Sequence, residues 1–405
     1  MLARRLLLVC AFAALTGALL PAEDKKPAPA GGAVKSLYNG KNLDGWVNVN
    51  CAPDTFFAKG EEIITTGKPT GFLRTDKQYE NFELDFDWMH VEKEKMANSG
   101  LFVWGDPLPA VGTGYTRGIE VQVLINYAPK DGWATCHGDI FSIWGAKCTP
   151  DRPHFKGIER CLPSENRVRG GGEWNHYKVI ANDGAIKLHV NGKEVSGVSK
   201  CNPRKGYLAL ESEGVECHFK NLKIKELPST NPKPEECAKV AEGHVSLFNG
   251  VDLKGWKTEK DAWKAGGGVL KAVGKGALVS EKEWDRSEVV FDWKRPAKSD
   301  GKIEVEVAGI AVTAAEGLVS AKWDAGPGGG SNATASFTPE AKQAVKPGTW
   351  NRAVITQDGK EITIAINGKV VHRMRTTAAK APVIFRPSEG LEIMNVFAKE
   401  LPAKK

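Results

Sequence analysis

Residues 82–88 read Phe-Glu-Leu-Asp-Phe-Asp-Trp, in which each apolar residue alternates with an acidic one. Successive side chains of a β-strand point to opposite faces, so this period of two predicts a strand with one buried face and one face in water. The end of the stretch returns later, where residues 291–293 again read Phe-Asp-Trp. A half-buried strand that occurs twice favours an all-β protein with two similar domains.

A longer phrase indicates that the whole chain is a tandem duplication. Residues 36–46 read Ser-Leu-Tyr-Asn-Gly-Lys-Asn-Leu-Asp-Gly-Trp, and residues 246–256 read Ser-Leu-Phe-Asn-Gly-Val-Asp-Leu-Lys-Gly-Trp. The offset between the copies falls from 210 at this phrase to 176 at the Trp-Asn pair of residues 174–175 and 350–351. The second copy has therefore lost 34 residues by that point, and function is expected in what only the first copy retains.

Turn signals follow the strands at similar places in both copies. Asp183-Gly184 and Asn191-Gly192 in the first copy correspond to Asp358-Gly359 and Asn367-Gly368 in the second. Such pairs favour two-residue hairpins, and no long segment shows a sustained helical stripe of apolar residues. The expected fold is two tandem antiparallel β-sandwiches of the jelly-roll kind.

The N-terminal residues have the layout of a secretory signal peptide. Arg4 and Arg5 precede an apolar run over residues 6–20, which is shorter than the roughly 20 residues that span a bilayer. We therefore expect an exported protein, periplasmic or extracellular, with no membrane span in the mature chain. The expected divisions are a signal peptide (1–22), a flexible leader (23–34), a first sandwich (35–227), a linker (228–244) and a second sandwich (245–401).

Charge and cysteines bound the class of partner and the redox chemistry. The net charge is +7 with basic and acidic residues interspersed, so no nucleic-acid partner is implied. Beyond Cys10 the chain has seven cysteines and no Cys-x-x-Cys pair, which favours disulfides over a metal site. We expect at least one disulfide, and the spacing around one strand and turn favours Cys201 with Cys217.

Candidate site residues lie in the segment that the second copy has shortened. Glu120 and Gln122 are two positions apart on a predicted strand and should share a face, and Asn98 and Ser99 begin another strand. A carboxylate with amides suits the binding of sugar hydroxyls and proton transfer. The alternative is that Glu120 and Gln122 only decorate a solvated face.

Further candidates follow in the same segment. His137 and Asp139 offer an imidazole and a carboxylate, and Trp104, Trp133 and Trp144 are candidates for stacking on a sugar ring or for core packing. Ordinary glycoside hydrolysis uses two carboxyl groups that flank the scissile bond. No second acid follows Glu120 closely on its own strand, so the local pattern points away from ordinary retaining hydrolysis.

These motifs, in this order, resemble the 3-keto-disaccharide hydrolase domain family, whose fold is similar to the concanavalin A-like lectin/glucanase sandwich. The resemblance covers residues 35–227 well and residues 245–401 in degenerate form. The family's Asn-Ser-Gly element falls on residues 98–100 and its Glu-x-Gln element on residues 120–122. Many members differ at three places, with Asp at Ile125, Gln at Glu211 and Thr-Gly-Ala at residues 137–139, which bears on the substrate.

The resemblance implies hydrolysis of a carbohydrate oxidised at C3. A ketone at C3 acidifies the hydrogen on C2, so one base can begin elimination of the C1 substituent, and water then completes a net hydrolysis. Glu120 is the expected base, with Gln122, Asn98 and His137 positioning or donating. A divalent cation is an alternative way to polarise the ketone, but the sequence shows no ligand cluster for one.

Two other functions fit the same fold: a glycan-binding protein without turnover, and an interaction module of an envelope complex. The second copy is expected to be catalytically silent. Residues 303–307 read Ile-Glu-Val-Glu-Val and are either a compressed Asn-Ser-Gly strand or a remnant of the Glu-x-Gln strand.

Overall fold

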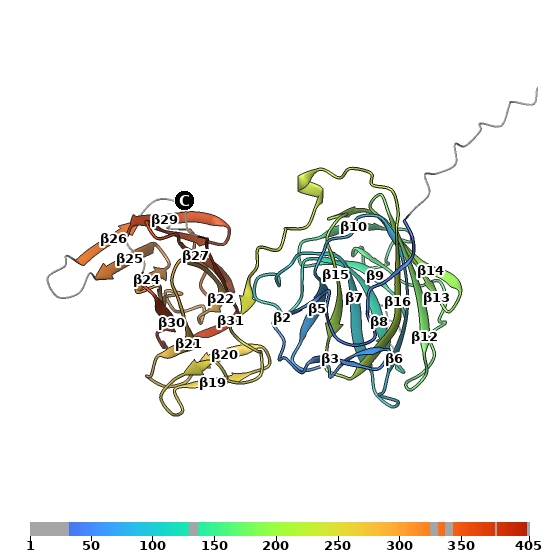
Figure 1. The fold of residues 1–405 in the computed structure, drawn as a ribbon, viewed down its shortest axis with the longest axis horizontal. Helices are drawn as coiled ribbons and strands as arrows, with labels where there is room; N and C mark the ends of the chain where they lie inside the picture. Colours follow the sequence, from blue (N-terminus) through green and yellow to red (C-terminus); the bar gives the residue numbers. More distant parts are fainter. Residues whose placement is uncertain (1–31, 129–136, 325–330, 337–342, 377–378, 403–405) are drawn as a thin grey trace, which may run out of the picture. The chain divides into compact units, whose positions relative to one another are not determined.

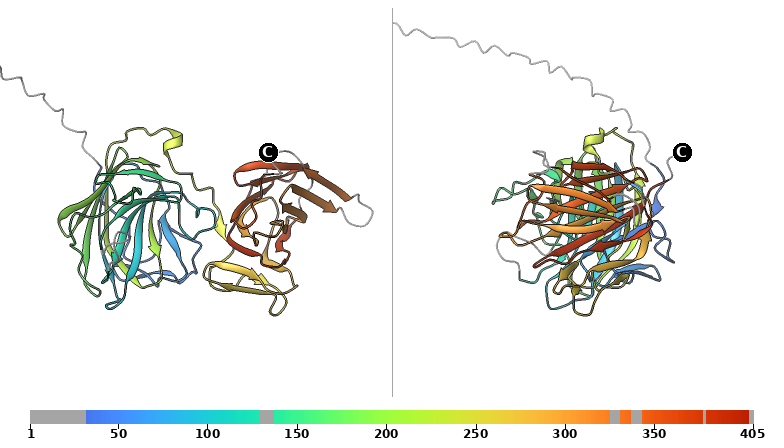
Figure 2. Two further views of the ribbon diagram at one scale, coloured as in Figure 1. Left: turned by 180° about the vertical axis from the view of Figure 1, so that it is seen from behind. Right: turned by 90° about the vertical axis from the view of Figure 1, so that its left-hand side faces the viewer.

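The computed structural model describes residues 32–128, 137–324, 331–336, 343–376 and 379–402. It confirms the expected all-β class: each half of the chain is an antiparallel sandwich of two sheets (Figure 1). The strands of each sandwich can be followed from two further directions in Figure 2. Among the described residues, no helix is long and apolar enough to cross a membrane.

The two sheets of the first sandwich each have a simple spatial order. One sheet runs β10 (Lys147–Pro150), β14 (Lys193–Asn202), β13 (Ala185–Val190), β12 (Asn175–Asn182), β6 (Phe82–His90), β16 (Cys217–Glu226), β4 (Glu62–Thr65), β3 (Phe56–Lys59), with β1 (Lys35–Ser36) paired to β16. The other runs β11 (Arg160–Cys161), β9 (Ile140–Ile143), β8 (Gly118–Ile125), β7 (Ala97–Gly105), β15 (Tyr207–Ser212), β5 (Gly71–Thr75), β2 (Trp46–Val49).

The second sandwich repeats this plan. One sheet runs β19 (Trp263–Gly266), β20 (Val269–Ala272), β31 (Glu392–Glu400), β22 (Ser287–Lys294), β27 (Asn351–Gln357), β28 (Glu361–Ile366), β29 (Lys369–Arg375), with β17 (Val245–Ser246) paired to β31. The other runs β18 (Trp256–Lys257), β21 (Leu278–Trp284), β30 (Ala381–Phe385), β23 (Ile303–Val307), β24 (Ile310–Ala315), β25 (Leu318–Asp324), β26 (Ser331–Ser336).

The alternating stretch of residues 82–88 forms β6, in the interior of its sheet between β12 and β16. Phe82, Leu84, Phe86 and Trp88 are fully buried, whereas the acids between them are partly exposed. The strand therefore has the one buried face that the period of two predicted. The hairpins after β12 and β13 turn at Asp183-Gly184 and Asn191-Gly192, all four with positive φ, as the tight turns between twisted strands require.

The repeated phrase builds the same corner in both copies. Trp46 is buried and its indole Nε1 donates to the carbonyl of Leu37 at 2.8 Å. Trp256 is buried in the second copy and donates in the same way to Leu247 at 2.7 Å. These tryptophans are structural, because a buried indole N–H needs an acceptor and the phrase supplies it nine residues earlier.

The expected disulfide between Cys201 and Cys217 is wrong. Cys201 lies in β14 and Cys217 in β16, and the strands β13, β12 and β6 stand between them. At about 4.8 Å per strand, the two positions are several times farther apart than a disulfide can bridge. Six cysteines of the described residues carry free thiols, and Cys136 lies outside the described residues.

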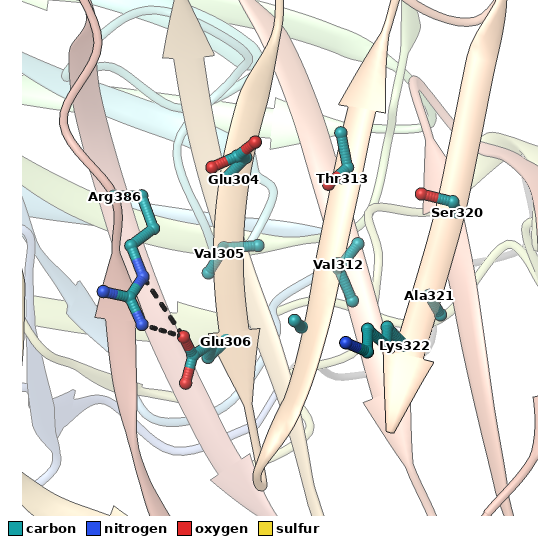
Figure 3. A pocket seen from close by; sticks show the side chains of 10 residues that line it. Glu304, Val305, Glu306, Val312, Thr313, Ser320, Ala321, Lys322 and Arg386 are labelled. Atoms are coloured by element: carbon teal, nitrogen blue, oxygen red, sulfur yellow. Dashed lines mark hydrogen bonds and ion pairs between the residues drawn. The ribbon is translucent and has the colours of Figure 1, made fainter. Parts of the chain in front are cut away.

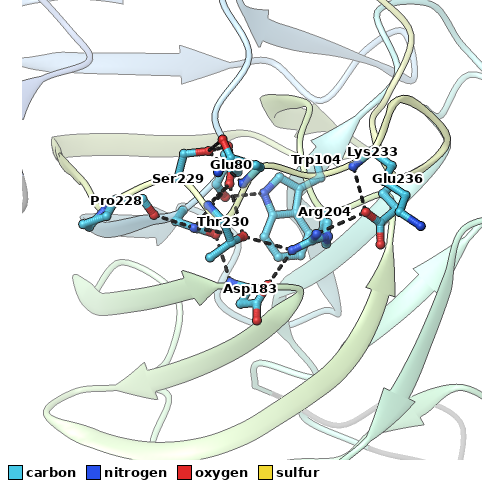
Figure 4. Close-up of polar contacts among 11 residues, drawn as sticks. Glu80, Trp104, Asp183, Arg204, Pro228, Ser229, Thr230, Lys233 and Glu236 are labelled. Atoms are coloured by element: carbon cyan, nitrogen blue, oxygen red, sulfur yellow. Dashed lines mark hydrogen bonds and ion pairs between the residues drawn. The ribbon is translucent and has the colours of Figure 1, made fainter. Parts of the chain in front are cut away.

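The segment after the first sandwich is tied to it by a polar network that includes the 3₁₀ turn η1 (Pro234–Glu236) (Figure 4). The carboxylate of Glu80 accepts hydrogen bonds from the backbone N–H of Thr230 at 2.6 Å and from Ser229 Oγ at 2.7 Å. The guanidinium of Arg204 donates to Thr230 Oγ1 at 2.9 Å and to Glu236 at 3.1 Å. This part of the linker is therefore ordered against the first sandwich.

Candidate active site

A cavity of about 780 Å³ lies over β7, β8 and β15 of the first sandwich. Its wall also includes β9, the segment directly after β9 and the segment directly before β11. The residues that argue for chemistry are two amides, four carboxyl groups, a guanidinium and aromatic rings: Asn98, Gln122, Glu120, Glu159, Glu211, Glu213, Arg160, Tyr115, Phe141 and Trp144.

Glu120 and Gln122 lie on the cavity side of β8, as their spacing predicted. Glu120 is 7% exposed and Gln122 is 4% exposed, so neither decorates a solvated face. The neighbouring strand β7 contributes Gly100, which pairs with Gln122 in the sheet. The absence of a side chain at Gly100 leaves room above the strand for the Glu120 carboxyl group.

A second carboxyl group reaches the same point from the other side of β7. A Cβ atom on Gly100 would lie 3.0 Å from Glu120 Oε1 and 3.0 Å from Glu211 Oε2. Glu211 belongs to β15, the other neighbour of β7, and is 1% exposed. The strand of Glu120 carries no second acid, as the sequence showed, and the acidic partner comes instead from a strand some 90 positions away in sequence.

A third carboxyl group is held in place by neutral donors. Glu213 accepts a hydrogen bond from Tyr115 OH at 2.8 Å and a short one from Asn98 Nδ2. Gln122 Nε2 in turn donates to Asn98 Oδ1 at 2.6 Å. The amides of Asn98 and Gln122 are thus tied to each other and to Glu213, which fixes the Glu213 carboxylate at the edge of the carboxyl cluster.

The electrostatics of the cluster favour protonated carboxyl groups. Burial raises the pKa of Glu120 to about 8; Glu213 and Asp139 add to the rise and Arg160 opposes it. Burial, followed by the charges of Glu120 and Glu213, raises the pKa of Glu211 well above its usual value. Carboxyl groups crowded in a low-dielectric pocket cannot all ionise, so some carboxyl groups of this site remain protonated at neutral pH.

Arg160 supplies the positive charge next to Glu120. Its guanidinium lines the cavity, lies 3.8 Å from the centre of the Phe141 ring, and forms an ion pair with Asp139. Asp139 is fully buried and does not line the cavity. The structure therefore places Asp139 behind the site, where it holds Arg160 rather than meeting a ligand.

Three other expected site residues do not line the cavity. Ser99 is fully buried and its hydroxyl donates to the carbonyl of Glu211 at 2.9 Å. Trp104 is fully buried with its indole bonded to the carbonyl of Glu80 at 2.8 Å. His137 is 5% exposed, and burial lowers its pKa to about 4, so its imidazole is neutral at physiological pH. Ser99 alternates with Asn98 and Gly100 and so points away from the cavity, and His137 is buried in the segment before β9. Trp104 has the parity of Asn98 and Gly100, but it lies at an irregularity of β7 with a φ of 57° and packs into the core.

Trp144 stands at the mouth of the cavity. The turn after β9 gives Trp144 and Gly145 positive φ angles of 51° and 96°, and this leaves the indole 52% exposed. Its ring stacks on Tyr115 at 6.4 Å between centroids with an interplanar angle of 13°. The exposed indole therefore offers a flat apolar surface beside the polar pocket. Trp133 lies outside the described residues.

Sequence comparison identifies the family. The chain matches the 3-keto-alpha-glucoside-1,2-lyase-like domain over residues 33–225 and again over residues 243–390. The chain belongs to this family. The two matched segments confirm two tandem copies, and they place the protein among carbohydrate-related hydrolases at a coarse level. No curated protein matches the chain.

Solved structures of similar proteins cover about one domain of this lyase-like chain. Two from Parabacteroides distasonis, assigned as glycosyl hydrolases, are 23% and 20% identical, cover 48% of this chain and 94% and 100% of their own, and give TM-scores of 0.36. The carbohydrate-binding module CBM66 of Bacillus subtilis is 14% identical, covers 45% of this chain and 96% of its own, with a TM-score of 0.33. None of these likenesses bears on the activity of this chain.

The second lyase-like copy carries different side chains on the matching face. Its sheet order places β30, β23 and β24 where the first copy has β15, β7 and β8, so residues 303–307 correspond to the Asn-Ser-Gly strand. In the first copy, the buried residues Leu210, Leu101 and Val121 pair with one another across the three strands. In the second copy, the buried residues Phe385, Val305 and Val312 pair in the same way.

One position along each strand from these paired residues, Glu304 of the second copy corresponds to Gly100 of the first, and Ala311 corresponds to Glu120. Arg386 takes the place of Glu211. These residues line a smaller hollow of about 460 Å³. Figure 3 shows Glu304 and Arg386 there, with Arg386 paired with Glu306. The acids of this face are partly exposed and ion-paired, and the buried carboxyl pair is missing from it.

Within the described parts of the chain, no three His, Cys, Asp or Glu side chains are arranged to hold a metal ion. We therefore assign no ligand set to the divalent cation considered as an alternative electrophile.

We expect the carboxyl cluster to make stability depend on pH. Because the pKa of Glu120 is about 8 in the folded protein and about 4.3 in an unfolded chain, its contribution is fully present below about pH 4.3 and is lost as the pH rises through about 8. The melting temperature should fall between pH 5 and pH 8, and fall less in Glu120→Gln. Melting curves of both proteins at several pH values check this, and equal slopes would contradict it.

Proposed function

We propose that the first sandwich is the catalytic domain of an exported enzyme that cleaves 3-keto-glycosides or 3-keto-disaccharides. The carboxylate of Glu120 takes the proton from C2, the C1 substituent leaves, and water adds across the double bond to complete the hydrolysis. The single observation that supports this most is the buried carboxyl pair over Gly100, because elimination and hydration need one base and one acid in the same small volume.

The surroundings of Glu120 support the role of base. Arg160 is the neighbouring cation, and it favours the carboxylate form of Glu120 over its acid form. The guanidinium also lines the cavity, where it can stabilise the negative charge that develops on the C3 oxygen as the C2 proton leaves. Asn98 and Gln122 fix the polar edge of the cavity through their mutual hydrogen bond.

Ordinary glycoside hydrolysis is a second candidate, favoured by the finding that Glu211 lies next to Glu120. The two reactions differ at C2, whose hydrogen is lost only in the elimination. We expect cleavage of 3-keto-trehalose in D₂O to place deuterium at C2 of the 3-keto-glucose product. Product retaining hydrogen at C2 would instead indicate direct hydrolysis.

Two controls complete this experiment. 3-Keto-glucose incubated with Glu120→Gln measures exchange that occurs after release, and unoxidised trehalose tests the need for the ketone. Cleavage of trehalose at the rate of 3-keto-trehalose would refute the proposed substrate class. Binding of both sugars without cleavage would identify a glycan-binding protein.

Trp144→Ala should weaken substrate binding more than it slows chemistry. The exposed indole contributes a stacking surface at the cavity mouth and has no contact with the carboxyl pair that an elimination would require. One stacked ring is worth about 1 kcal/mol, so KM should rise about five- to tenfold with little change in kcat. Steady-state kinetics on 3-keto-trehalose measure this, and an unchanged KM would exclude Trp144 from the binding site.

A further inference from the structure

The two carboxyl groups over Gly100 have different surroundings. The charged neighbours of Glu120 are the carboxyl groups of Glu213 and Asp139 and the guanidinium of Arg160, whereas those of Glu211 are the carboxyl groups of Glu120 and Glu213, with no cation among them. Oε2 of Glu211 is buried and has no hydrogen-bond partner among the described residues. This oxygen is the one that lies above Gly100, on the cavity side.

This difference in surroundings gives the carboxyl groups of Glu120 and Glu211 different roles. A carboxyl group beside a cation gives up its proton more readily than one beside other carboxyl groups. Glu120 is therefore the group that accepts a proton, and Glu211 is the group that carries one. Glu213, fixed by Asn98 and Tyr115, shares a hydrogen bond with Glu211 and orients it.

We propose that Glu211 is the general acid of this site, which protonates the departing oxygen, and that Glu213 is its positioning residue. The proposal deepens the proposed function and rests on it.

The reaction has two steps, elimination and hydration. Glu120 takes the proton from C2, the C2–H electron pair forms the C1–C2 double bond, and the C1–O bond breaks with its electron pair on the departing oxygen. That oxygen takes the proton of Glu211 and leaves as an alcohol. In the second step the Glu211 carboxylate removes a proton from water, hydroxide adds to C1, and Glu120, whose proton has exchanged with the water that entered the site, delivers a proton to C2. Both residues end in their starting forms.

The test compares two leaving groups in Glu211→Gln. A 3-keto-glucoside of 4-nitrophenol needs little protonation to leave, whereas a methyl 3-keto-glucoside needs much. Loss of a general acid costs about 100-fold or more where protonation is needed. We expect kcat/KM on the methyl glycoside to fall at least about 100-fold, and on the nitrophenyl glycoside less than about fivefold.

The ratio of the two rates within one preparation does not depend on how much of the variant is folded. Glu211→Asp, which retains an acid but retracts it by one methylene, should give an intermediate ratio. An equal loss on both substrates, or no loss on either, overturns the proposal while leaving the proposed function in place. Failure of the unmodified protein on both substrates overturns the proposed function itself, and the assignment of Glu211 with it.

Discussion

Glu120→Gln should lower turnover of 3-keto-trehalose by about 1,000-fold or more. The amide keeps the shape of the side chain in its buried position but cannot accept the proton from C2, and general-base contributions are of this order. The fold should survive, because the substitution removes a carboxyl group from a crowded cluster and leaves the amide-bonded edge of the site untouched. Turnover and melting temperature are measured on the same preparations.

The matched control is Glu304→Gln in the second sandwich. Glu304 also lies on the cavity-facing side of its sheet, but it is partly exposed and paired with Lys302. Turnover by the full chain should be unchanged. Wild-type activity in Glu120→Gln would refute the assignment of the base, and loss of activity in Glu304→Gln would refute the expectation that the second copy is silent.

Asp139→Asn should be the most destabilising conservative substitution near the site. Asp139 is fully buried and the guanidinium of Arg160 is 8% exposed, so the substitution removes the charge of one partner from a buried ion pair. Breaking one side of such a buried pair costs about 3 kcal/mol. Urea denaturation should show a lower midpoint with an unchanged slope.

Asp183→Asn is the control for this effect. Asp183 is paired with Arg204, but the aspartate side chain is 63% exposed, and solvent screens the interaction. Its loss should cost no more than about 1 kcal/mol. Equal midpoints for the two variants would show that the buried pair contributes no more than a surface pair.

Local patterns in the sequence predicted the fold, because the alternation of a strand and the residue types of a turn can be recognised within the segment itself. The alternation of residues 82–88 matches the buried and half-exposed faces of β6, and Asn191-Gly192 turns where a two-residue hairpin was expected. The tandem repeat then extended the same fold to the second half of the chain.

Only part of the site could be predicted from the sequence, because the rest depends on which strands become neighbours in the sheet. Glu120 and Gln122 share a face by spacing alone, but nothing near them in sequence shows that β15 lies on the other side of β7. Glu211 and Glu213 are two positions apart, the same spacing that singled out Glu120 and Gln122, but nothing local in the sequence connects the two pairs. His137, by contrast, had the right chemistry but is buried away from the cavity.

The glycine between the two carboxyl groups bears on the history of the duplication. In the second copy the acid stands on the central strand, at Glu304, and the flanking positions carry Ala311 and Arg386. A glutamate at 311 would lie directly across the strand pair from Glu306, and a glutamate at 386 would remove the arginine with which Glu306 is paired. The carboxyl pair of the first copy therefore differs from the second copy at three positions on three strands, and no single point substitution restores it.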